Sequence, residues 1–204
     1  MSTGLAELTD EQLIVSCRGA EDARARVLVG ELARRHFERV TGFIHALVDD
    51  AAVAQDLAQE AFVRVYAHRD AYRDIGRFST WMFTIARNLA LNEVRNRRLR
   101  PALTLDGTRP TGSGPMGAVV PADAPAPADE AARGDLRAAV RRAIEALDEH
   151  HRVVVVLCDI EERPYAEAAE VLGVPVGTIR SRLSRAREQL ERRLRGVLGE
   201  GQHG

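Results

Sequence analysis

Polar and cationic side chains near the C-terminus have the composition and spacing of a DNA-contacting surface. They recur three or four residues apart: Thr178, Arg180, Ser181, Ser184 and Arg185. On a helix, that spacing places them on one face. Arginine can donate two hydrogen bonds to a guanine edge in the major groove, and serine can contact bases or phosphates. The pattern predicts binding to double-stranded DNA rather than a basic face exposed only to solvent.

A helix-turn-helix is expected to position this face. Residues 165–172 predict a short helix in which Ala169 is small enough for a close crossing. Gly173 suits the positive φ of a turn, and Pro175 precedes or opens the next helix. The buried side of that helix follows a three-four spacing: Ile179, Leu183, Ala186, Leu190 and Leu194. The first turns of such a helix enter the major groove. The later arginines at 192, 193 and 195 are interpreted as solvated.

A second polar stripe occurs in the first half of the chain: Trp81, Thr84, Asn88, Asn92 and Arg95, with Met82, Ile85, Ala86 and Leu89 facing the core. It combines an aromatic surface, amides that can contact base edges, and a cation for phosphate, as single-stranded nucleic acid requires. The alternative, which we favour for a tryptophan taken alone, places Trp81 in the core. Two asparagines one turn apart are poor helix formers and indicate a functional face.

The elements that carry these residues are all predicted to be helical. Few aromatic residues (4 %) and many Leu, Ala, Arg and Glu favour helices over sheets. A capping box of Thr9 and Gln12 begins the first helix and Gly19 ends it. The next carries Leu28 to Leu47 on one face, and further helices are expected at 56–68, 79–98, 130–148, 150–160, 165–172 and 176–196. We predict an all-α fold with no strand.

A segment rich in proline and glycine divides the chain. Residues 101–128 hold six prolines and four glycines with almost no charge, a composition typical of flexible linkers. We therefore predict two small helical domains, at 8–100 and 130–199, joined by a flexible linker at 101–129. A long loop within a single domain is the alternative, although structureless loops of this length are uncommon in compact domains.

Composition excludes several other classes of protein. The net charge of −1 indicates no partner by itself, but basic clusters near 95–100 and 180–195 lie apart from acidic residues at 49–60. The only cysteines, Cys17 and Cys158, are far apart and predict no disulfide framework. No signal peptide or long apolar stretch is present, so we expect a cytoplasmic protein without membrane insertion.

An enzyme is a further alternative. The candidate metal ligands are His150, His151 and Cys158, and the last two could share a helix face. A third ligand on that face and a general base are missing. The sequence also lacks a phosphate-binding loop, a Ser-His-Asp arrangement and paired catalytic carboxylates. We predict no catalytic residue, no metal and no cofactor.

Three segments, in this order, resemble the extracytoplasmic-function (ECF) group of the sigma-seventy family: DLAQEAFVRVYAHRDAYR, FSTWMFTIARNLALNEVRNRR and VPVGTIRSRLSRAREQL. The resemblance covers roughly 8–100 and 130–196. It implies a sigma factor that binds core RNA polymerase, directs it to promoters and promotes melting of the duplex. It also implies a stress or envelope response and regulation by an anti-sigma factor.

The resemblance assigns a role to three groups of residues. One matches the segment that docks on a coiled coil of the largest polymerase subunit: Asp56, Gln59 and Glu60. Another matches the part that melts the promoter and binds the unpaired minus-ten strand: Phe78, Thr80, Trp81, Thr84, Asn88, Asn92 and Arg95. The third matches the face that meets the minus-thirty-five duplex: Thr178, Arg180, Ser181, Ser184 and Arg185.

The sequence departs from the family pattern at several positions. Ala168 stands where a bulky aliphatic residue is usual, and each missing methylene is expected to cost about 1 kcal/mol of burial. Pro164 replaces a Ser or Thr cap, and Cys158 replaces a residue that often contacts the DNA backbone. The linker is also less acidic than in many relatives.

A dimeric helix-turn-helix regulator with an N-terminal sensing domain is the other function to weigh. Such a protein needs a ligand pocket or a phosphoacceptor aspartate after a strand, and the first domain predicts neither. It would also leave the stripe around Trp81, Asn88 and Asn92 unexplained.

Overall fold

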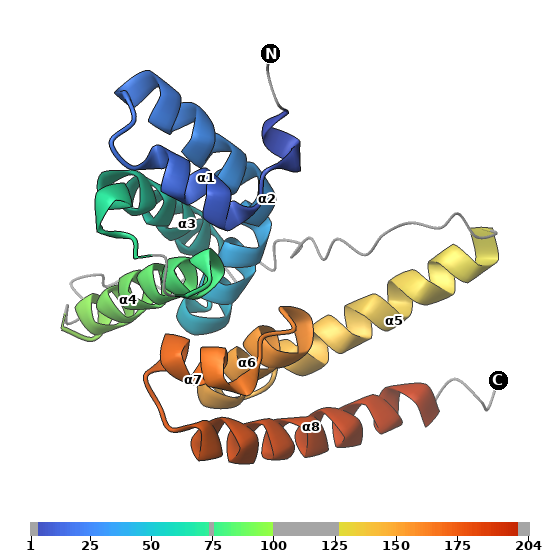
Figure 1. Ribbon diagram of the computed structural model, residues 1–204. Helices are drawn as coiled ribbons and strands as arrows, with labels where there is room; N and C mark the ends of the chain where they lie inside the picture. The colour runs from blue at the N-terminus through green and yellow to red at the C-terminus, as the bar shows by residue number, and fades with distance from the viewer. Residues whose placement is uncertain (1–3, 74–75, 100–126, 200–204) are drawn as a thin grey trace, which may run out of the picture. The chain divides into compact units, whose positions relative to one another are not determined.

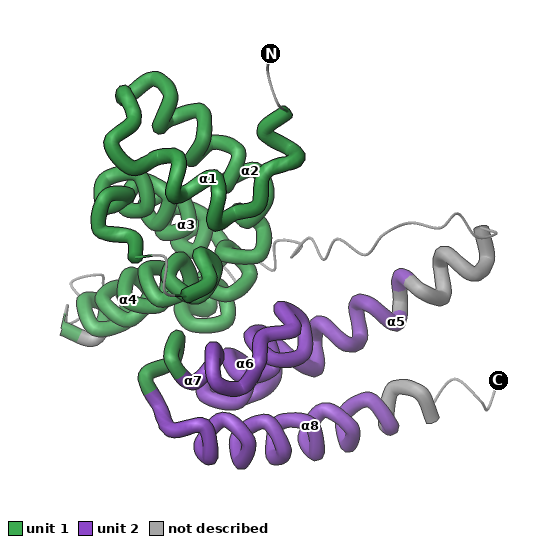
Figure 2. Tube along the Cα trace, in the orientation of Figure 1, with its two compact units in different colours: residues 1–115, 170–173 green, residues 116–169, 174–204 purple. Residues whose placement is uncertain are grey.

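A computed structural model describes residues 4–73, 76–99 and 127–199, and every regular element within those ranges is helical (Figure 1). The predicted all-α class is therefore confirmed. The chain divides into two compact units: residues 1–115 with 170–173, and residues 116–169 with 174–204 (Figure 2). Of the predicted linker, residues 101–126 lie outside the described residues.

The first unit begins with a short 3-10 turn, η1 (Leu5–Glu7), and helix α1 (Asp10–Cys17). The predicted capping box is present, because Thr9 accepts from the Gln12 amide at 3.2 Å and the Gln12 side chain accepts from the Thr9 amide at 2.8 Å. Gly19, just beyond the helix, has a φ of 62°, a conformation that glycine adopts without strain. The boundaries of α1 thus follow from its local sequence.

Helix α2 (Asp22–Val48) packs against α1, α3 (Ala51–Ala67) and α4 (Phe78–Leu99), with the turn η2 (Arg69–Ala71) between the last two. The centre of this core contains large, fully buried side chains from three of these helices: Leu13, Ile14, Leu32, Val40, Phe43, Ile44, Phe78, Met82 and Phe83. The edge-to-face pair of Phe43 and Phe83, with ring centroids 5.2 Å apart, joins α2 to α4. Ile85 was expected in this core but is only partly buried.

Helix α3 begins at Ala51, five residues earlier than the predicted start at 56. The side chain of Asp50 accepts a hydrogen bond from the Val53 amide at 3.1 Å and so caps the helix. The same carboxylate lies 3.2 Å from the guanidinium of Arg97 on α4. The prediction missed this start because the alanines at 51, 52 and 54 carry little apolar periodicity.

The second half of the chain contains α5 (Pro127–Glu145), α6 (Glu149–Val155), the π-helical segment η3 (Val156–Ile160), α7 (Tyr165–Leu172) and α8 (Val176–Gly199). All of these lie in the second unit except residues 170–172 at the end of α7. Residues 127–129 belong to the first turn of α5 and not to the linker, which corrects that boundary. Proline fits there because its missing amide would have no partner in the helix. The single predicted helix over 150–160 is α6 followed by the wider π-helical turn.

Within the described residues, no helix is both long enough and apolar enough to cross a membrane. Cys17 is buried, Cys158 is partly buried, and both are free thiols.

A polar network around Asp10 joins α1 to α2. Its carboxylate lies 2.6 Å from Nε2 of the buried His36 and accepts from Arg35 at 3.0 Å. The His36 hydrogen bond, followed by the charges of His36 and Arg35, holds the pKa of Asp10 below its usual range despite partial burial. A carboxylate whose pKa is lowered on folding stabilises the protein above its unfolded-state pKa, and loses that contribution as the pH falls through its folded-state pKa.

Asp10→Asn is therefore expected to lower the free energy of unfolding at pH 7 by about 1–3 kcal/mol, as for other hydrogen bonds to charged groups. The deficit should shrink as the pH falls from the ordinary aspartate pKa of 3.8 toward the lowered pKa of folded Asp10. Urea unfolding at pH 7, 5 and 3 measures this difference. Asp22, an acid whose side chain is 68 % exposed in its pair with Arg69, provides the control Asp22→Asn, which is expected to change stability by less than about 1 kcal/mol. An Asp10→Asn deficit that is the same at every pH would contradict the assignment.

Candidate nucleic-acid and polymerase interfaces

The first turns of α8 present the predicted DNA-contacting face. Ile179, Leu183 and Ala186 are buried on one side of the helix. The opposite side exposes Arg180, Ser181, Ser184 and Arg185, with Thr178 partly exposed at its start. Gly173, with a φ of 63°, makes the turn from α7, and the Pro175 carbonyl accepts from the Thr178 amide at 2.9 Å. The turn chemistry expected from the sequence is thus present.

The two arginines of this face differ from four later arginines of α8, at 187, 192, 193 and 195. Within the described residues, neither Arg180 nor Arg185 forms an ion pair. Arg187 instead donates to both carboxylate oxygens of Asp159 on η3, its Nε at 3.2 Å. Further along α8, three arginines bond to carbonyls or to a neighbouring acid: Arg192 to the Glu188 carbonyl, Arg193 to the Ala146 carbonyl and Arg195 to Glu191. Arg180 and Arg185 are therefore the cations of this face available to an incoming anion.

Arg187 is a residue to which sequence reasoning assigned no individual role. Its ion pair with Asp159 ties α8 to the π-helical segment that precedes the helix-turn-helix. No spacing rule could have found this pair, since the two residues are 28 positions apart. Arg187 therefore helps to orient α8 within the second unit.

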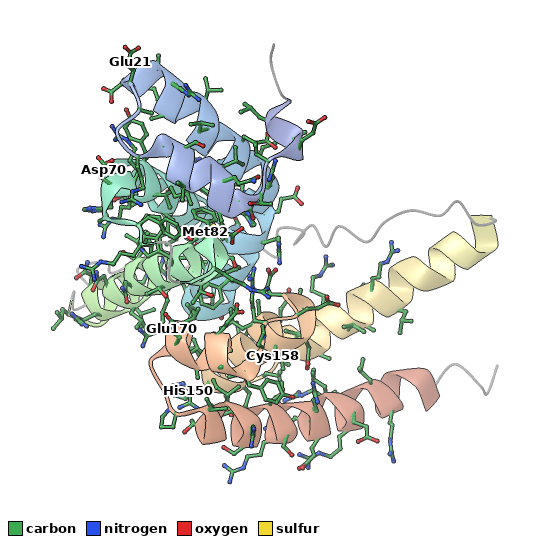
Figure 3. The ribbon with its side chains drawn as sticks, in the orientation of Figure 1. Glu21, Asp70, Met82, His150, Cys158 and Glu170 are labelled. Carbon is green, nitrogen blue, oxygen red and sulfur yellow. The ribbon has the colours of Figure 1, made fainter. Side chains whose placement is uncertain are left out.

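The stripe on α4 consists of an exposed part and a partly buried part. Asn88, Asn92 and Arg95 are exposed, whereas Thr84 and Trp81 are partly buried. The Thr84 hydroxyl donates to the Thr80 carbonyl at 2.8 Å. On the opposite side, Met82 is fully buried and Leu89 is 5 % exposed; Figure 3 labels Met82 on this helix. The three exposed residues thus form a continuous polar surface on a helix anchored by its other face.

Trp81 belongs both to this stripe and to an aromatic cluster. Its ring centroid lies 5.3 Å from that of Tyr72 and 6.2 Å from that of Phe78. The Tyr72 hydroxyl donates to the Gly76 carbonyl at 2.8 Å. One side of the indole is therefore held by neighbouring rings while the residue keeps some exposure, so neither the core interpretation nor the surface interpretation is complete alone.

Phe78 and Thr80 do not lie on the accessible surface with the rest of the stripe. Phe78 is fully buried and Thr80 is 5 % exposed. Both occur in the first turn of α4, whose inward side meets the core formed with α2. In this structure their side chains are part of the core under the stripe and are not accessible to DNA.

The acidic face of α3 is exposed. Asp56 and Gln59 are exposed to solvent, and Glu60 is partly exposed. Oε1 of Glu60 lies 2.9 Å from Nε of Arg64. Val63, one turn further along, is 58 % exposed. Ala58, Ala61 and Phe62 are buried on the other side of the helix, which leaves this face available to a partner.

Comparison with known proteins identifies the family. The Sigma-70 region 2 model matches residues 32–100, and the Sigma-70, region 4 model matches residues 137–190. The chain is 31 % identical over 181 residues to the ECF RNA polymerase sigma factor SigW of Bacillus subtilis, covering 88 % of this chain and 93 % of SigW. It is 34 % identical over 196 residues to the RNA polymerase sigma-H factor of Pseudomonas aeruginosa, covering 96 % and 99 % of the two chains. This chain belongs to the ECF sigma factor family.

The fold of this ECF sigma factor resembles a solved structure of the sigma factor RpoE in complex with the anti-sigma factor NepR from Bartonella quintana. The two share a TM-score of 0.60 and 24 % identity, over 81 % of this chain and 96 % of the other. The comparison supports the fold. Family membership favours an initiation factor over a dimeric helix-turn-helix regulator.

The departures from the family pattern are accommodated within the second unit of the sigma factor. Ala168 is fully buried and Ala169 is 7 % exposed, so two small side chains are buried in succession on α7. The carbonyl of Pro164 accepts from the Ala168 amide at 3.0 Å, which begins α7 without a Ser or Thr side-chain cap. Cys158 is partly buried and offers no cation to a phosphate.

The metal-site alternative finds no support in this geometry. His150 is exposed on α6, and Cys158 lies on the π-helical segment (Figure 3). His151 Nδ1 lies 3.3 Å from the amide nitrogen of Gln189. Burial is the main cause that raises the pKa of Cys158, to about 11, which disfavours the thiolate that binds metals. In the described part of the chain, no three His, Cys, Asp or Glu side chains cluster closely enough to hold a metal ion.

Proposed function

We propose that the two units of this ECF sigma factor divide promoter recognition between them. As a member of the family, the protein binds core RNA polymerase and directs it to promoters. In the proposal, the domain at 8–100 docks on polymerase and handles the minus-ten strand, and the domain at 130–199 binds the minus-thirty-five duplex. The observation that carries the proposal is the exposed surface of Asn88, Asn92 and Arg95 on α4, whose opposite side is core.

The chemistry of the stripe fits an unpaired strand. Asparagine can both donate to and accept from base edges, and unpaired bases are free to meet these groups or stack on an aromatic ring. On α8, Arg180 and Arg185 beside two serines suit the duplex major groove. The two surfaces thus differ in the form of DNA that they suit.

Transcription in vitro with purified core polymerase tests the proposal. We expect the protein to confer initiation on a cognate promoter, and to bind that promoter poorly without polymerase. Tight promoter binding by the protein alone, without stimulation of transcription, would contradict it. We expect the protein to act in the cytoplasm, where RNA polymerase and its promoters are found.

Polymerase docking is proposed to use the acidic face of α3 at Asp56, Gln59 and Glu60. Asp56→Lys should weaken binding to core polymerase by about tenfold at low salt, and less at high salt, because surface charges mainly steer association and are screened by ions. Competition against labelled wild-type protein at two salt concentrations measures this. Glu38→Lys, an exposed charge reversal on α2, is the control. Equal losses in both variants would show a general charge effect and not docking through α3.

Regulation by an anti-sigma factor is part of the proposal. The structurally similar RpoE was solved with the anti-sigma factor NepR. An inhibitor that competes with core polymerase for this protein would fit the proposed stress or envelope response. The gene next to this one is the first place to look, and a membrane protein with a small helical cytoplasmic domain is the expected product.

A further inference from the structure

The start of α4 is held by a residue far away in the sequence. The first amides of a helix have no partner within the helix and leave a partial positive charge there. Here the amide of Phe78, the first residue of α4, donates to Oε1 of Glu11 on α1 at 3.3 Å, across 67 positions of sequence. The carboxylate of Glu11 therefore satisfies one of the unpaired donors of α4 and links its first turn to α1.

A second contact from α1 reaches the same turn through two rings. Asp10 lies 2.6 Å from Nε2 of His36, a side chain that is only 5 % exposed. The His36 ring packs against Phe78 with centroids 5.8 Å apart, and Phe78 packs in turn against Trp81 at 6.2 Å. Glu11 thus bonds directly to the backbone of Phe78, and Asp10 supports the Phe78 ring through His36.

From these contacts we infer that Glu11 is a positioning residue for promoter melting. It sets the first turn of α4, supported by the contacts of Asp10 and His36, and so determines where Trp81 stands relative to the strand that opens. This inference rests on the proposed function of α4. In this inference, Glu11 does not contact DNA and acts only through Phe78.

The geometry distinguishes a positional role from a role of charge alone. Glu11→Asp keeps the negative charge and an acidic first turn for α1, but withdraws the carboxylate by one methylene. Glu11→Gln loses the charge and keeps an acceptor oxygen in place. If position matters, Gln should preserve function better than Asp. If negative charge near the helix start suffices, the order is reversed.

The experiment measures open-complex formation by the full-length protein with core polymerase. Each variant is assayed on a duplex promoter and on the same promoter opened beforehand as a mismatched bubble. We expect Glu11→Asp and Glu11→Ala to lose about tenfold on the duplex, the scale of one lost hydrogen bond to a charged group, and to act normally on the bubble. Glu11→Gln should remain within about threefold of wild type on both templates, since a neutral hydrogen bond replaces a charged one.

Two further variants complete the design. Glu7→Ala removes an exposed acid from the neighbouring turn η1 and should behave as wild type. Trp81→Ala tests the proposed function of α4 itself. If Trp81→Ala impairs melting while every Glu11 variant melts normally, the inference fails and the proposed function stands. If the Trp81→Ala variant opens the duplex promoter normally, both the inference and the proposed function of α4 fail.

The remaining outcomes also overturn the inference. Losses of equal size on duplex and bubble, accompanied by weaker polymerase binding, would make Glu11 a residue of general stability. If Glu11→Asp retains open-complex formation and Glu11→Gln loses it, the negative charge of Glu11 and not its position is the cause. If Glu11→Ala does not fold, the comparison of Asp with Gln decides alone, because both keep the first turn of α1 polar and of similar size.

Discussion

Arg185→Ala is expected to weaken recognition of the upstream promoter element by about 1–3 kcal/mol, the usual effect of losing an arginine that contacts a base edge. Arg185 is exposed on the early turns of α8 and, within the described residues, has no carboxylate partner. Its guanidinium therefore gives up no ion pair on binding DNA. The buried residues Leu183 and Ala186 on either side keep the helix in place when the side chain is shortened.

The measurement is holoenzyme affinity for a promoter and for a set of single base-pair changes in its upstream element. We expect the variant to lose discrimination at one or two positions and to behave as wild type at the others. Arg192→Ala is the matched control, an exposed arginine two turns further along α8 whose Nε donates to the Glu188 carbonyl. A uniform loss across all sequences would make Arg185 a phosphate contact.

Asn88→Ala is expected to spare binding to the upstream duplex and to reduce open-complex formation by about tenfold or more, which corresponds to one lost base contact of about 1–3 kcal/mol. Asn88 is exposed and contributes nothing to the core of the first unit. Alanine is also the better helix former. A loss of melting without a loss of stability would therefore reflect a missing contact with DNA.

Permanganate reactivity of unpaired thymines in the minus-ten region follows the opened strand directly. Asn96→Ala on the same helix is the control, since it removes an exposed asparagine to which the proposal assigns no contact with DNA. Wild-type thymine reactivity with Asn88→Ala would remove Asn88 from the minus-ten surface. Equal defects in both variants would point to a change in α4 as a whole.

Most of the fold could be predicted because its signals are local. The capping box at Thr9, the positive φ of Gly173 and the three-four spacing of Ile179, Leu183 and Ala186 each depend on residues within one or two turns. Errors arose where the local signal was weak. The start of α3 depended on a cap by Asp50, and Leu190 and Leu194 matched the apolar spacing yet are only partly buried.

The sequence alone determined which helix faces carry chemistry and the family to which the chain belongs. Helical periodicity and motif order are properties of neighbouring residues, so no tertiary contact is needed to see them. Only the tertiary structure decided which of those residues are accessible. It buried Phe78 and Thr80, left Asn88 and Asn92 exposed, and engaged Arg187 with Asp159. Burial and long-range pairing depend on which other element covers a face, and residues distant in sequence such as Glu11 and Phe78 meet only when the helices pack.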